Sequence, residues 1–359
     1  MRIGILSFSI ASGNGQSRFA INLSRGLINE GKNVSLFAYS CSKEDAEKLR
    51  SQGLSVFSYK IKLSKIDLYR SISDSSKVFS EMLKIVRNTE PCDYYLVLSD
   101  ELLGILRYKG KERGKWAYLS NGDLTLLFLN QGFLDKYSPY THFLKRRFVS
   151  QMMRHQSKIL NYDCLFANSK FTQTIMSFVL NTDFTDYIYP PVDTEFFRRS
   201  FKSNDGGEKN YALVMLRNNA EPMVRTIQRV AKKIPVKIVG EAKVNGAITL
   251  GRISDEDLVD AYSKALVTIG PSKQEFFGYA TAESLSCGTP VIAFKRGAAV
   301  EMIDHNQNGW LVDTQEELLS KLVDIFEDGY NKNMRDIARR SAEKFSISAS
   351  TNKILSLLR

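Results

Sequence analysis

Short apolar runs alternate with longer amphipathic segments along the first half of the chain. The runs are rich in β-branched, aromatic and leucine residues, and each is short enough to form a buried strand. We predict strands at Ile3–Phe8, Val34–Tyr39, Leu54–Tyr59, Tyr94–Leu98, Trp116–Leu119 and Cys164–Ala167. Between the first two runs, Phe19, Leu23 and Leu27 recur at helical spacing, and Gly31 follows where a helix would end. Alternation of this kind indicates an α/β layer with a mainly parallel sheet.

The same pattern restarts after an interruption at Pro190 and Pro191. Neither proline can donate a backbone hydrogen bond, and the polar run Lys202–Lys209 follows, so we place a hinge there. Ser254 and Thr314 begin capping-box patterns that would open two later helices. Further strands are predicted at Ala212–Leu216, Val236–Val239, Val267–Ile269 and Pro290–Phe294. Two α/β halves joined by a hinge are suited to closing around a ligand.

Composition narrows the class of protein. The 359 residues suit two domains of about 100–200 residues each. With 43% hydrophobic and 25% charged residues, the chain is typical of a globular protein rather than a disordered one. No stretch reaches the roughly 18 apolar residues that a membrane span needs, and the apolar N-terminus lacks a signal-peptide cleavage site. We therefore expect a cytoplasmic protein that does not cross a membrane.

The cysteines and histidines predict neither disulfides nor a metal site. The four cysteines lie far apart without zinc-like spacing, and we expect reduced, mostly buried thiols. The three histidines form no cluster of metal ligands. Asp255 and Asp257 resemble a metal-binding D-x-D element, but they follow Ser254 at a predicted helix start. We interpret them as first-turn charges that favour the helix dipole.

The net charge of +11 suits anionic partners such as nucleic acid, anionic lipid or phosphate-bearing small molecules. A merely solvated basic surface is an equal alternative. In the segment 141–160, Leu144, Phe148, Met152 and Ile159 mark one helical face, with lysines and arginines around the rest. This segment suits contact with an anionic membrane surface, or packing on the domain core. No nucleic-acid-binding module is recognisable, so we expect no nucleic-acid partner.

The most informative stretch runs from Leu250 to Val312. A predicted strand ending at Ile269 leads into a turn containing Gly278, and a helix is expected to begin near Tyr279. Unpaired backbone N–H groups at such a helix start bind phosphate well. Glu275 lies just before the helix and Glu283 one turn inside it, where two carboxylates can hold hydroxyls of a nucleotide sugar. From spacing alone, two solvated glutamates are the alternative.

This stretch resembles the signature of family 4 glycosyltransferases, retaining enzymes of the GT-B fold. Their pattern P-S-x-x-E-x-F-G, followed by E and then G-x-P-V-I-A, is kept at both glutamates, at Phe277 and Gly278, and from Cys287 to Ala293. Three neighbouring segments also resemble family motifs: Tyr189–Phe197, Leu250–Leu258 and Glu301–Val312. Several motifs in the right order make the resemblance specific.

The resemblance implies an α/β, GT-B protein with two Rossmann-like domains facing each other across a donor-binding cleft. It implies an N-terminal acceptor-side domain at 1–192, a nucleotide-sugar-binding domain at 193–345, and a C-terminal helix at 346–359 packed back on the first domain. The implied activity moves a sugar, with retention, from a UDP or GDP sugar to a hydroxyl of a glycan or lipid-linked acceptor. No metal or other cofactor is expected, because positive groups and helix dipoles can offset the diphosphate charge.

The residue roles of the family fall on the same motif. The first glutamate contacts the donor sugar, which makes Glu275 the catalytic candidate, and the second holds the ribose hydroxyls, which makes Glu283 a donor-binding residue. Backbone amides around Phe277, Gly278 and Tyr279 would face the distal phosphate.

Four further donor-binding candidates lie outside this motif. Gly15 matches the second glycine of the family's N-terminal glycine pair, and Asn121 stands where a histidine is often found. Arg217 matches the arginine that clasps the diphosphate, whereas Pro222 occupies the place of the lysine, so Arg225 is the candidate substitute. The departures at Asn121 and Pro222 leave open a low-activity GT-B scaffold subunit of a glycan-assembly complex. A GT-B nucleotide-sugar epimerase is the other alternative, although the motifs match transferases better.

Overall fold

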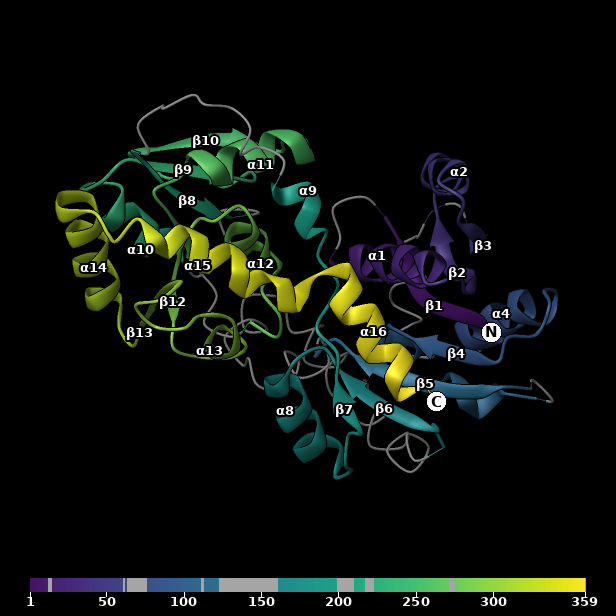
Figure 1. Cartoon of the computed structure of the whole chain (residues 1–359). Helices are drawn as coiled ribbons and strands as arrows, with labels where there is room; N and C mark the ends of the chain where they lie inside the picture. Colours follow the sequence, from purple (N-terminus) through teal and green to yellow (C-terminus); the bar gives the residue numbers. More distant parts are fainter. Residues whose placement is uncertain are drawn as a thin grey trace, which may run out of the picture. The chain divides into compact units, whose positions relative to one another are not determined.

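The computed structural model describes residues 1–11, 15–60, 62, 76–110, 113–122, 161–198, 210–216, 223–270 and 275–358. The chain divides into two compact units (Figure 1). The first unit consists of Met1–Pro191 together with Ser350–Arg359, and the second of Val192–Ala349. The division falls between Pro191 and Val192, directly after the two consecutive prolines.

The first unit is built on a seven-stranded parallel sheet in the order β3-β2-β1-β4-β5-β6-β7. Its strands are β1 (Arg2–Ile10), β2 (Asn33–Cys41), β3 (Ser55–Lys60), β4 (Tyr94–Val97), β5 (Lys115–Ser120), β6 (Cys164–Ala167) and β7 (Asp186–Tyr187). Successive side chains of β1 enter different cores: Leu6 and Phe8 pack on one face, Ile3 and Ile5 on the other. Both faces are therefore covered, which explains the continuous apolar runs. All six predicted strands are confirmed.

Helices cover both faces of this sheet. They are α1 (Gly15–Asn29), α2 (Lys43–Ser51), α4 (Ser76–Arg87) and α8 (Lys170–Leu180), with the short 3₁₀ helices η1 (Asp100–Leu102) and η2 (Ile105–Tyr108) after β4. As predicted, α1 buries Phe19, Leu23 and Leu27, and the chain turns at Gly31, whose φ of +69° favours glycine. The end of α16 (Ile347–Leu357) also belongs here, because Ile354 joins the same core as Ile3.

The second unit is a six-stranded parallel sheet in the order β10-β9-β8-β11-β12-β13 (Figure 1). Its strands are β8 (Ala212–Met215), β9 (Val236–Val239), β10 (Ala247–Gly251), β11 (Val267–Gly270), β12 (Val291–Phe294) and β13 (Gly309–Val312). The helices are α9 (Thr194–Arg198), α10 (Val224–Val230), α11 (Asp255–Lys264), α12 (Tyr279–Ser286), α13 (Ala299–Met302), α14 (Gln315–Asp328), α15 (Asn333–Ala342) and the 3₁₀ helix η4 (Glu343–Phe345). The four strands predicted here are confirmed. Both units are thus Rossmann-like, as expected for a GT-B fold.

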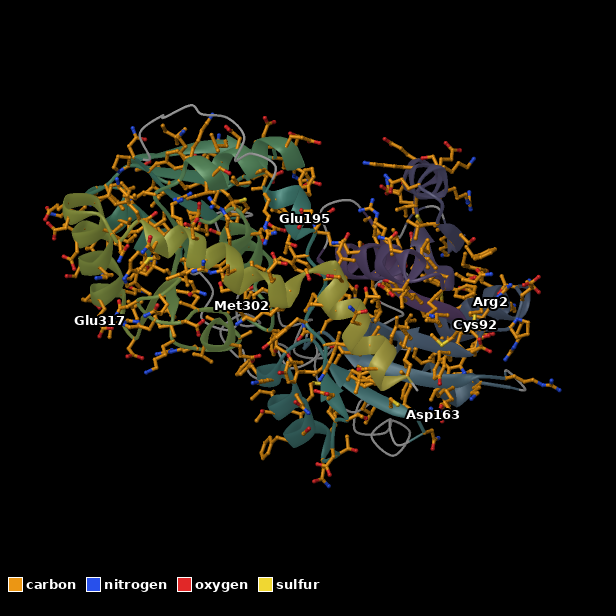
Figure 2. The ribbon with its side chains drawn as sticks, in the orientation of Figure 1. Arg2, Cys92, Asp163, Glu195, Met302 and Glu317 are labelled. Carbon is orange, nitrogen blue, oxygen red and sulfur yellow. The ribbon has the colours of Figure 1, made fainter. Side chains whose placement is uncertain are left out.

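Both predicted helix caps are present in the second unit. The Ser254 hydroxyl accepts a hydrogen bond from the Asp257 N–H at 3.1 Å, and Thr314 accepts one from the Glu317 N–H at 3.1 Å. Glu317, in the first turn of α14 (Figure 2), also accepts the N–H of Asp313 at 2.8 Å. The Ser254 hydroxyl in turn donates to the Asp257 carboxylate at 2.8 Å. Asp257 therefore serves a helix cap, as its position in the sequence predicts.

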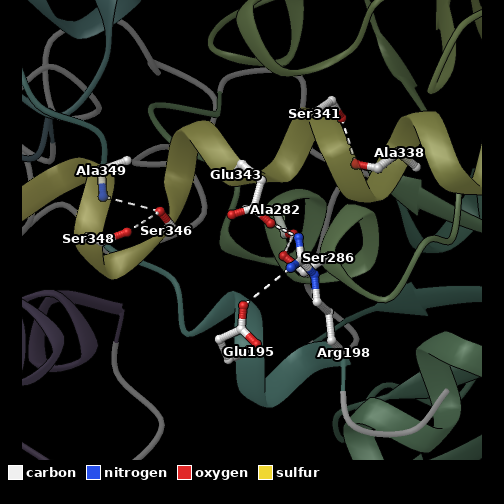
Figure 3. A network of polar contacts seen from close by, with 10 residues as sticks. All are labelled: Glu195, Arg198, Ala282, Ser286, Ala338, Ser341, Glu343, Ser346, Ser348 and Ala349. Carbon is white, nitrogen blue, oxygen red and sulfur yellow. Dashed lines mark hydrogen bonds and ion pairs between the residues drawn. The ribbon is translucent and has the colours of Figure 1, made fainter. Parts of the chain in front are cut away.

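A polar network connects α9, near the start of the second unit, with η4, near its end (Figure 3). The Arg198 guanidinium, on α9, forms ion pairs with Glu195 and with Glu343 of η4. Nearby, the Val192 N–H donates to the Phe345 carbonyl at 2.8 Å. The buried Cys287 thiol, at the end of α12, donates to the Phe197 carbonyl at 3.1 Å. These contacts hold α9 and η4 beside α12.

Other expectations about the chain can also be compared with the structure. All four cysteines are free thiols, and three of them are buried, as predicted. No helix within the described ranges is long and apolar enough to span a bilayer. The basic segment 141–160, predicted either to contact an anionic membrane surface or to pack on the domain core, lies outside the described residues.

Candidate functional site

The motif glutamates lie at the switch point of the second sheet. β8 and β11 are neighbouring strands there. The strand that follows β8 lies on one side of this pair and the strand that follows β11 lies on the other. Ligands of open α/β sheets bind outside the carboxyl ends of the strands at such a point. After β11 the described chain resumes at Glu275, and α12 begins at Tyr279 with no side-chain cap from the described residues. The start of α12 therefore offers backbone N–H groups to a ligand.

The turn after β12 fixes the backbone of Glu275. The Ala298 N–H donates to the Glu275 carbonyl at 2.8 Å. Gly297, with φ of +61°, passes so close that a Cβ atom on it would lie 2.5 Å from the same carbonyl oxygen. Only glycine suits both the conformation and the space. Two segments about twenty residues apart in the sequence thus determine where the half-buried Glu275 lies.

The Phe277 side chain anchors the start of α12 in the core. Its ring is 6% exposed and makes edge-to-face contacts with Tyr279 at 5.1 Å and Phe345 at 5.6 Å between centroids. A buried aromatic cluster of this kind adds about 0.5–1.5 kcal/mol per pair beyond area burial. Phe277 therefore positions the backbone of Gly278 and Tyr279, and its ring packs away from solvent.

Glu283 is almost fully enclosed, with 3% of its surface exposed. Its carboxylate accepts a hydrogen bond from the hydroxyl of Tyr262, on α11, at 3.1 Å. A buried carboxylate needs such partners to offset its lost hydration. The alternative of two solvated glutamates is thus wrong for Glu283. Tyr262, which holds this carboxylate, has no signal in the sequence, because it lies on a different helix.

Of the two arginine candidates in this unit, the structure describes only Arg225. Arg225 lies exposed in the first turn of α10, which follows the carboxyl end of β8. Arg217, together with Pro222, lies outside the described residues. Among the described side chains, no group of three histidine, cysteine, aspartate or glutamate residues is placed to hold a metal ion.

Gly15 and Asn121 belong to the first unit, apart from the motif residues. Gly15 is the first residue of α1, directly beyond the carboxyl end of β1. Asn121 follows β5, and its side-chain amide donates to the Leu98 carbonyl at 2.5 Å. The Asn121 N–H donates to the Asp100 carboxylate at 3.2 Å, and its carbonyl accepts from the Asn168 amide at 3.1 Å. Asn121 therefore links the carboxyl ends of three neighbouring strands.

Two acidic residues beside Asn121 were not among the predicted site residues. Asp100 is buried and also accepts a hydrogen bond from the Tyr118 hydroxyl at 2.6 Å. Burial, reinforced by Asp100, holds the pKa of Tyr118 well above its ordinary value, so the phenol stays protonated and donates. Burial also raises the pKa of Glu101, the next residue. Perturbed carboxyl groups of this kind are common in functional sites.

Comparison with known proteins agrees with the motif. Residues 237–345 match the family described as glycosyl transferases group 1. The chain is 35% identical over 104 residues to D-inositol 3-phosphate glycosyltransferase from Corynebacterium jeikeium, covering 28% of this chain and 24% of that protein. The chain thus spans only about a quarter of the length of this curated relative.

Two solved structures are similar over nearly the whole chain. Sucrose-phosphate synthase from Thermosynechococcus elongatus superposes with a TM-score of 0.76 at 16% identity, covering 99% of this chain and 98% of that one. HepE from Anabaena, solved with UDP and glucose, gives a TM-score of 0.71 at 16% identity, covering 100% and 99%. Both likenesses concern the fold. Residues 237–345 thus match the family of group 1 glycosyl transferases, and the whole chain has the two-domain GT-B fold of these structures.

Proposed function

We propose that this protein is a retaining glycosyltransferase that moves a sugar from a UDP or GDP sugar to a hydroxyl of a glycan or lipid-linked acceptor. The observation that carries the proposal is the start of α12, a helix N-terminus that no described side chain caps, at a sheet switch point and flanked by Glu275 and Glu283. A diphosphate suits the helix start, and the two carboxylates suit sugar and ribose hydroxyls.

Each residue has a role in this proposal. Glu275 contacts the donor sugar, Glu283 holds the ribose, and the amides from Phe277 to Tyr279 face the distal phosphate. The acceptor hydroxyl attacks the anomeric carbon on the face from which the nucleotide leaves. We infer that no metal is needed, since helix-dipole and basic groups offset the diphosphate charge. Asp257 of the D-x-D-like element is bonded through its N–H and its carboxylate to the Ser254 hydroxyl, which caps α11.

The activities of similar proteins support the substrate class. The HepE structure contains UDP and glucose, and the Corynebacterium relative is a D-inositol 3-phosphate glycosyltransferase. The matched family and its structural neighbours favour a transferase over an epimerase. A cytoplasmic location and contact with an anionic membrane surface stay predictions.

Binding measurements on variants test the proposed function. We would titrate UDP, GDP, UDP-glucose and GDP-mannose into the protein by calorimetry, and into Glu275→Ala and Glu283→Ala. Loss of Glu283 should weaken bare nucleotide and full donor alike, by about 1.5–3 kcal/mol for a charged hydrogen bond. Loss of Glu275 should weaken the full donor and abolish turnover, with little effect on the bare nucleotide.

A matched control and a contrary outcome complete this test. Glu327→Ala changes an exposed glutamate of α14 in the same unit and should bind every probe as the parent does. If the parent binds no nucleotide or nucleotide sugar, or if both motif variants bind as the parent does, the scaffold alternative replaces the enzyme. One structural observation favours that alternative: the Asn121 amide, a candidate donor-binding group, already donates to the Leu98 carbonyl.

A further inference from the structure

Three aromatic rings form a row across neighbouring strands of the first sheet. Phe8 of β1, Tyr39 of β2 and Tyr59 of β3 lie near the carboxyl ends of their strands, where the register of the flanking residues places them side by side. Phe8 stacks on Tyr39 with 5.5 Å between ring centroids, and Tyr39 stacks on Tyr59 at 5.7 Å. The row thus lies toward the end of the sheet at which ligands of parallel α/β layers bind.

A buried carboxylate fixes the orientation of two of these rings. Glu81, on α4, is 5% exposed and accepts a hydrogen bond from the Tyr39 hydroxyl at 2.9 Å. The Tyr59 hydroxyl also donates to Glu81, and this bond raises the pKa of Tyr59. The Lys77 ammonium lies 3.9 Å from the same carboxylate, one helical turn earlier. The two tyrosine rings are therefore held in place before any ligand arrives, which lowers the entropic cost of binding to them.

Tyr59 ends the row and has an open ring face. β3 is the edge strand of the described sheet, so Tyr39 covers the ring of Tyr59 from the side of the sheet. Tyr59 is 44% exposed, and no ring or cation of the described residues stacks on its other face. A rigid, exposed aromatic ring offers a large contact area at a low cost in conformational entropy. The Tyr59 ring thus forms a platform on the surface of the first unit.

The chemistry of this platform suits a sugar ring. A pyranose has an apolar face of C–H groups, which fits the negative face of an aromatic ring, and a rim of hydroxyls. The Lys60 ammonium lies 5.8 Å from the centroid of the Tyr39 ring, beside the platform, and an ammonium can donate hydrogen bonds to such hydroxyls. Apolar contact and hydrogen-bond donors are thus available side by side.

We propose that the exposed face of Tyr59 binds a pyranose ring of the acceptor by stacking. The inference rests on the proposed function and specifies its acceptor, because the platform selects a saccharide rather than a lipid without sugar. The subsite lies entirely within the first unit, so it binds sugar whether or not a donor is present. No bond forms or breaks there, and Tyr59 contributes affinity and selectivity.

Sugar binding by variants of Tyr59 tests this subsite. We would add methyl α-glucoside, methyl α-mannoside and methyl α-galactoside to the whole protein and measure their affinities by saturation-transfer NMR. Tyr59→Phe keeps the ring and should retain binding. Tyr59→Leu keeps only apolar bulk and Tyr59→Ser keeps neither, so both should bind the sugars about tenfold more weakly, the upper effect of one aromatic contact. The melting temperature and the affinity for UDP or GDP should stay close to those of the parent.

Two control variants show where the sugar binds. Phe178→Ser removes another exposed ring of the same unit, 86% exposed on α8, and should leave sugar binding unchanged. Glu275→Ala alters the proposed donor-sugar site and should also leave the methyl glycosides bound. If Glu275→Ala loses them and Tyr59→Ser does not, the sugars occupy the donor site and the proposal is overturned.

Three other results would also overturn the proposal. These are parental sugar affinity in Tyr59→Leu and Tyr59→Ser, unfolding of both variants, which would make Tyr59 structural, and a parent that binds no methyl glycoside. A parent that binds UDP or GDP but no methyl glycoside refutes only the subsite. A parent that binds neither nucleotide refutes the proposed function, and the assignment of the bound sugar as an acceptor with it.

Discussion

Replacing Tyr262 by phenylalanine would remove one hydroxyl from beside the buried Glu283. The ring is fully buried and packs edge-to-face on Phe197 at 6.2 Å, and phenylalanine keeps that packing. The Thr289 hydroxyl bonds the backbone carbonyl of Tyr262 at 2.7 Å, which the substitution also leaves intact. The change therefore isolates the 3.1 Å hydrogen bond from the tyrosine hydroxyl to the Glu283 carboxylate.

The expected loss follows from the charge and burial of the acceptor. A hydrogen bond to a charged group contributes about 1.5–3 kcal/mol, and a buried carboxylate that loses a donor keeps its desolvation cost. We expect Tyr262→Phe to lower the free energy of unfolding by that amount, measured by urea denaturation. Because the hydroxyl also fixes the orientation of the carboxylate, affinity for UDP or GDP should fall as well, measured by calorimetry.

A matched variant separates this effect from the general cost of removing a buried hydroxyl. The Tyr211 hydroxyl donates to the neutral Ala261 carbonyl at 2.7 Å in the same unit. Tyr211→Phe should cost only about 0.5–1.5 kcal/mol and leave nucleotide binding unchanged. Equal losses of stability in the two variants, with parental nucleotide affinity in both, would refute the assignment of Tyr262 as the residue that positions Glu283.

Four further predictions concern metal, pH, backbone and membrane. Donor turnover should persist in excess chelator, and loss of activity that manganese or magnesium restores would contradict this. The raised pKa of Glu101 means that its contribution to stability is fully present below the ordinary carboxyl pKa of 4.5 and is lost as pH rises through the folded-state value. Glu101→Gln should therefore gain stability relative to the parent as the pH of a urea titration rises from about 4 to about 8, and a difference independent of pH would count against the burial of this carboxyl. Gly297→Ala should weaken donor binding, because the new methyl group meets the Glu275 carbonyl. Gly329→Ala also places alanine at a positive φ, but it has open space around it and should leave donor binding unchanged. Similar donor affinities in the two alanine variants would show that the close approach does not position Glu275. Binding to anionic vesicles through 141–160 should weaken as salt rises, since charges are screened over about 8 Å at physiological ionic strength, and equal binding to neutral vesicles would remove the membrane contact.

Apolar periodicity was sufficient to predict ten of the strands, because strands buried on both faces must be continuously apolar. The same signal missed three others. β10 lies at the edge of its sheet, and its residues are half-buried or exposed, so it carries no apolar run. β7 has only two residues. β13 lies within a segment recognised for its motif rather than as a strand.

The motif also indicated, from the sequence alone, the family that residues 237–345 match and the pair of glutamates at a helix start. Order and spacing along the chain suffice for that, because β11, the turn and α12 are contiguous. The positions of those glutamates depend on distant residues. Gly297 fixes the Glu275 backbone from the turn after β12, and Tyr262 bonds Glu283 from α11. Such contacts depend on how the elements pack, so the local spacing of residues does not predict them.

Asp100 and Glu101 show most clearly what only the tertiary structure decided. In the sequence they are two adjacent acidic residues with the same chemistry. In the fold, Tyr118 and Asn121 satisfy the first, while an oxygen of the second is enclosed without a partner among the described residues. The difference arises because the groups that donate to Asp100 lie in β5 and directly after it. β5 meets η1 only when the sheet forms. Burial and pairing, which set the pKa and the role of a carboxyl group, are properties of the assembled strands.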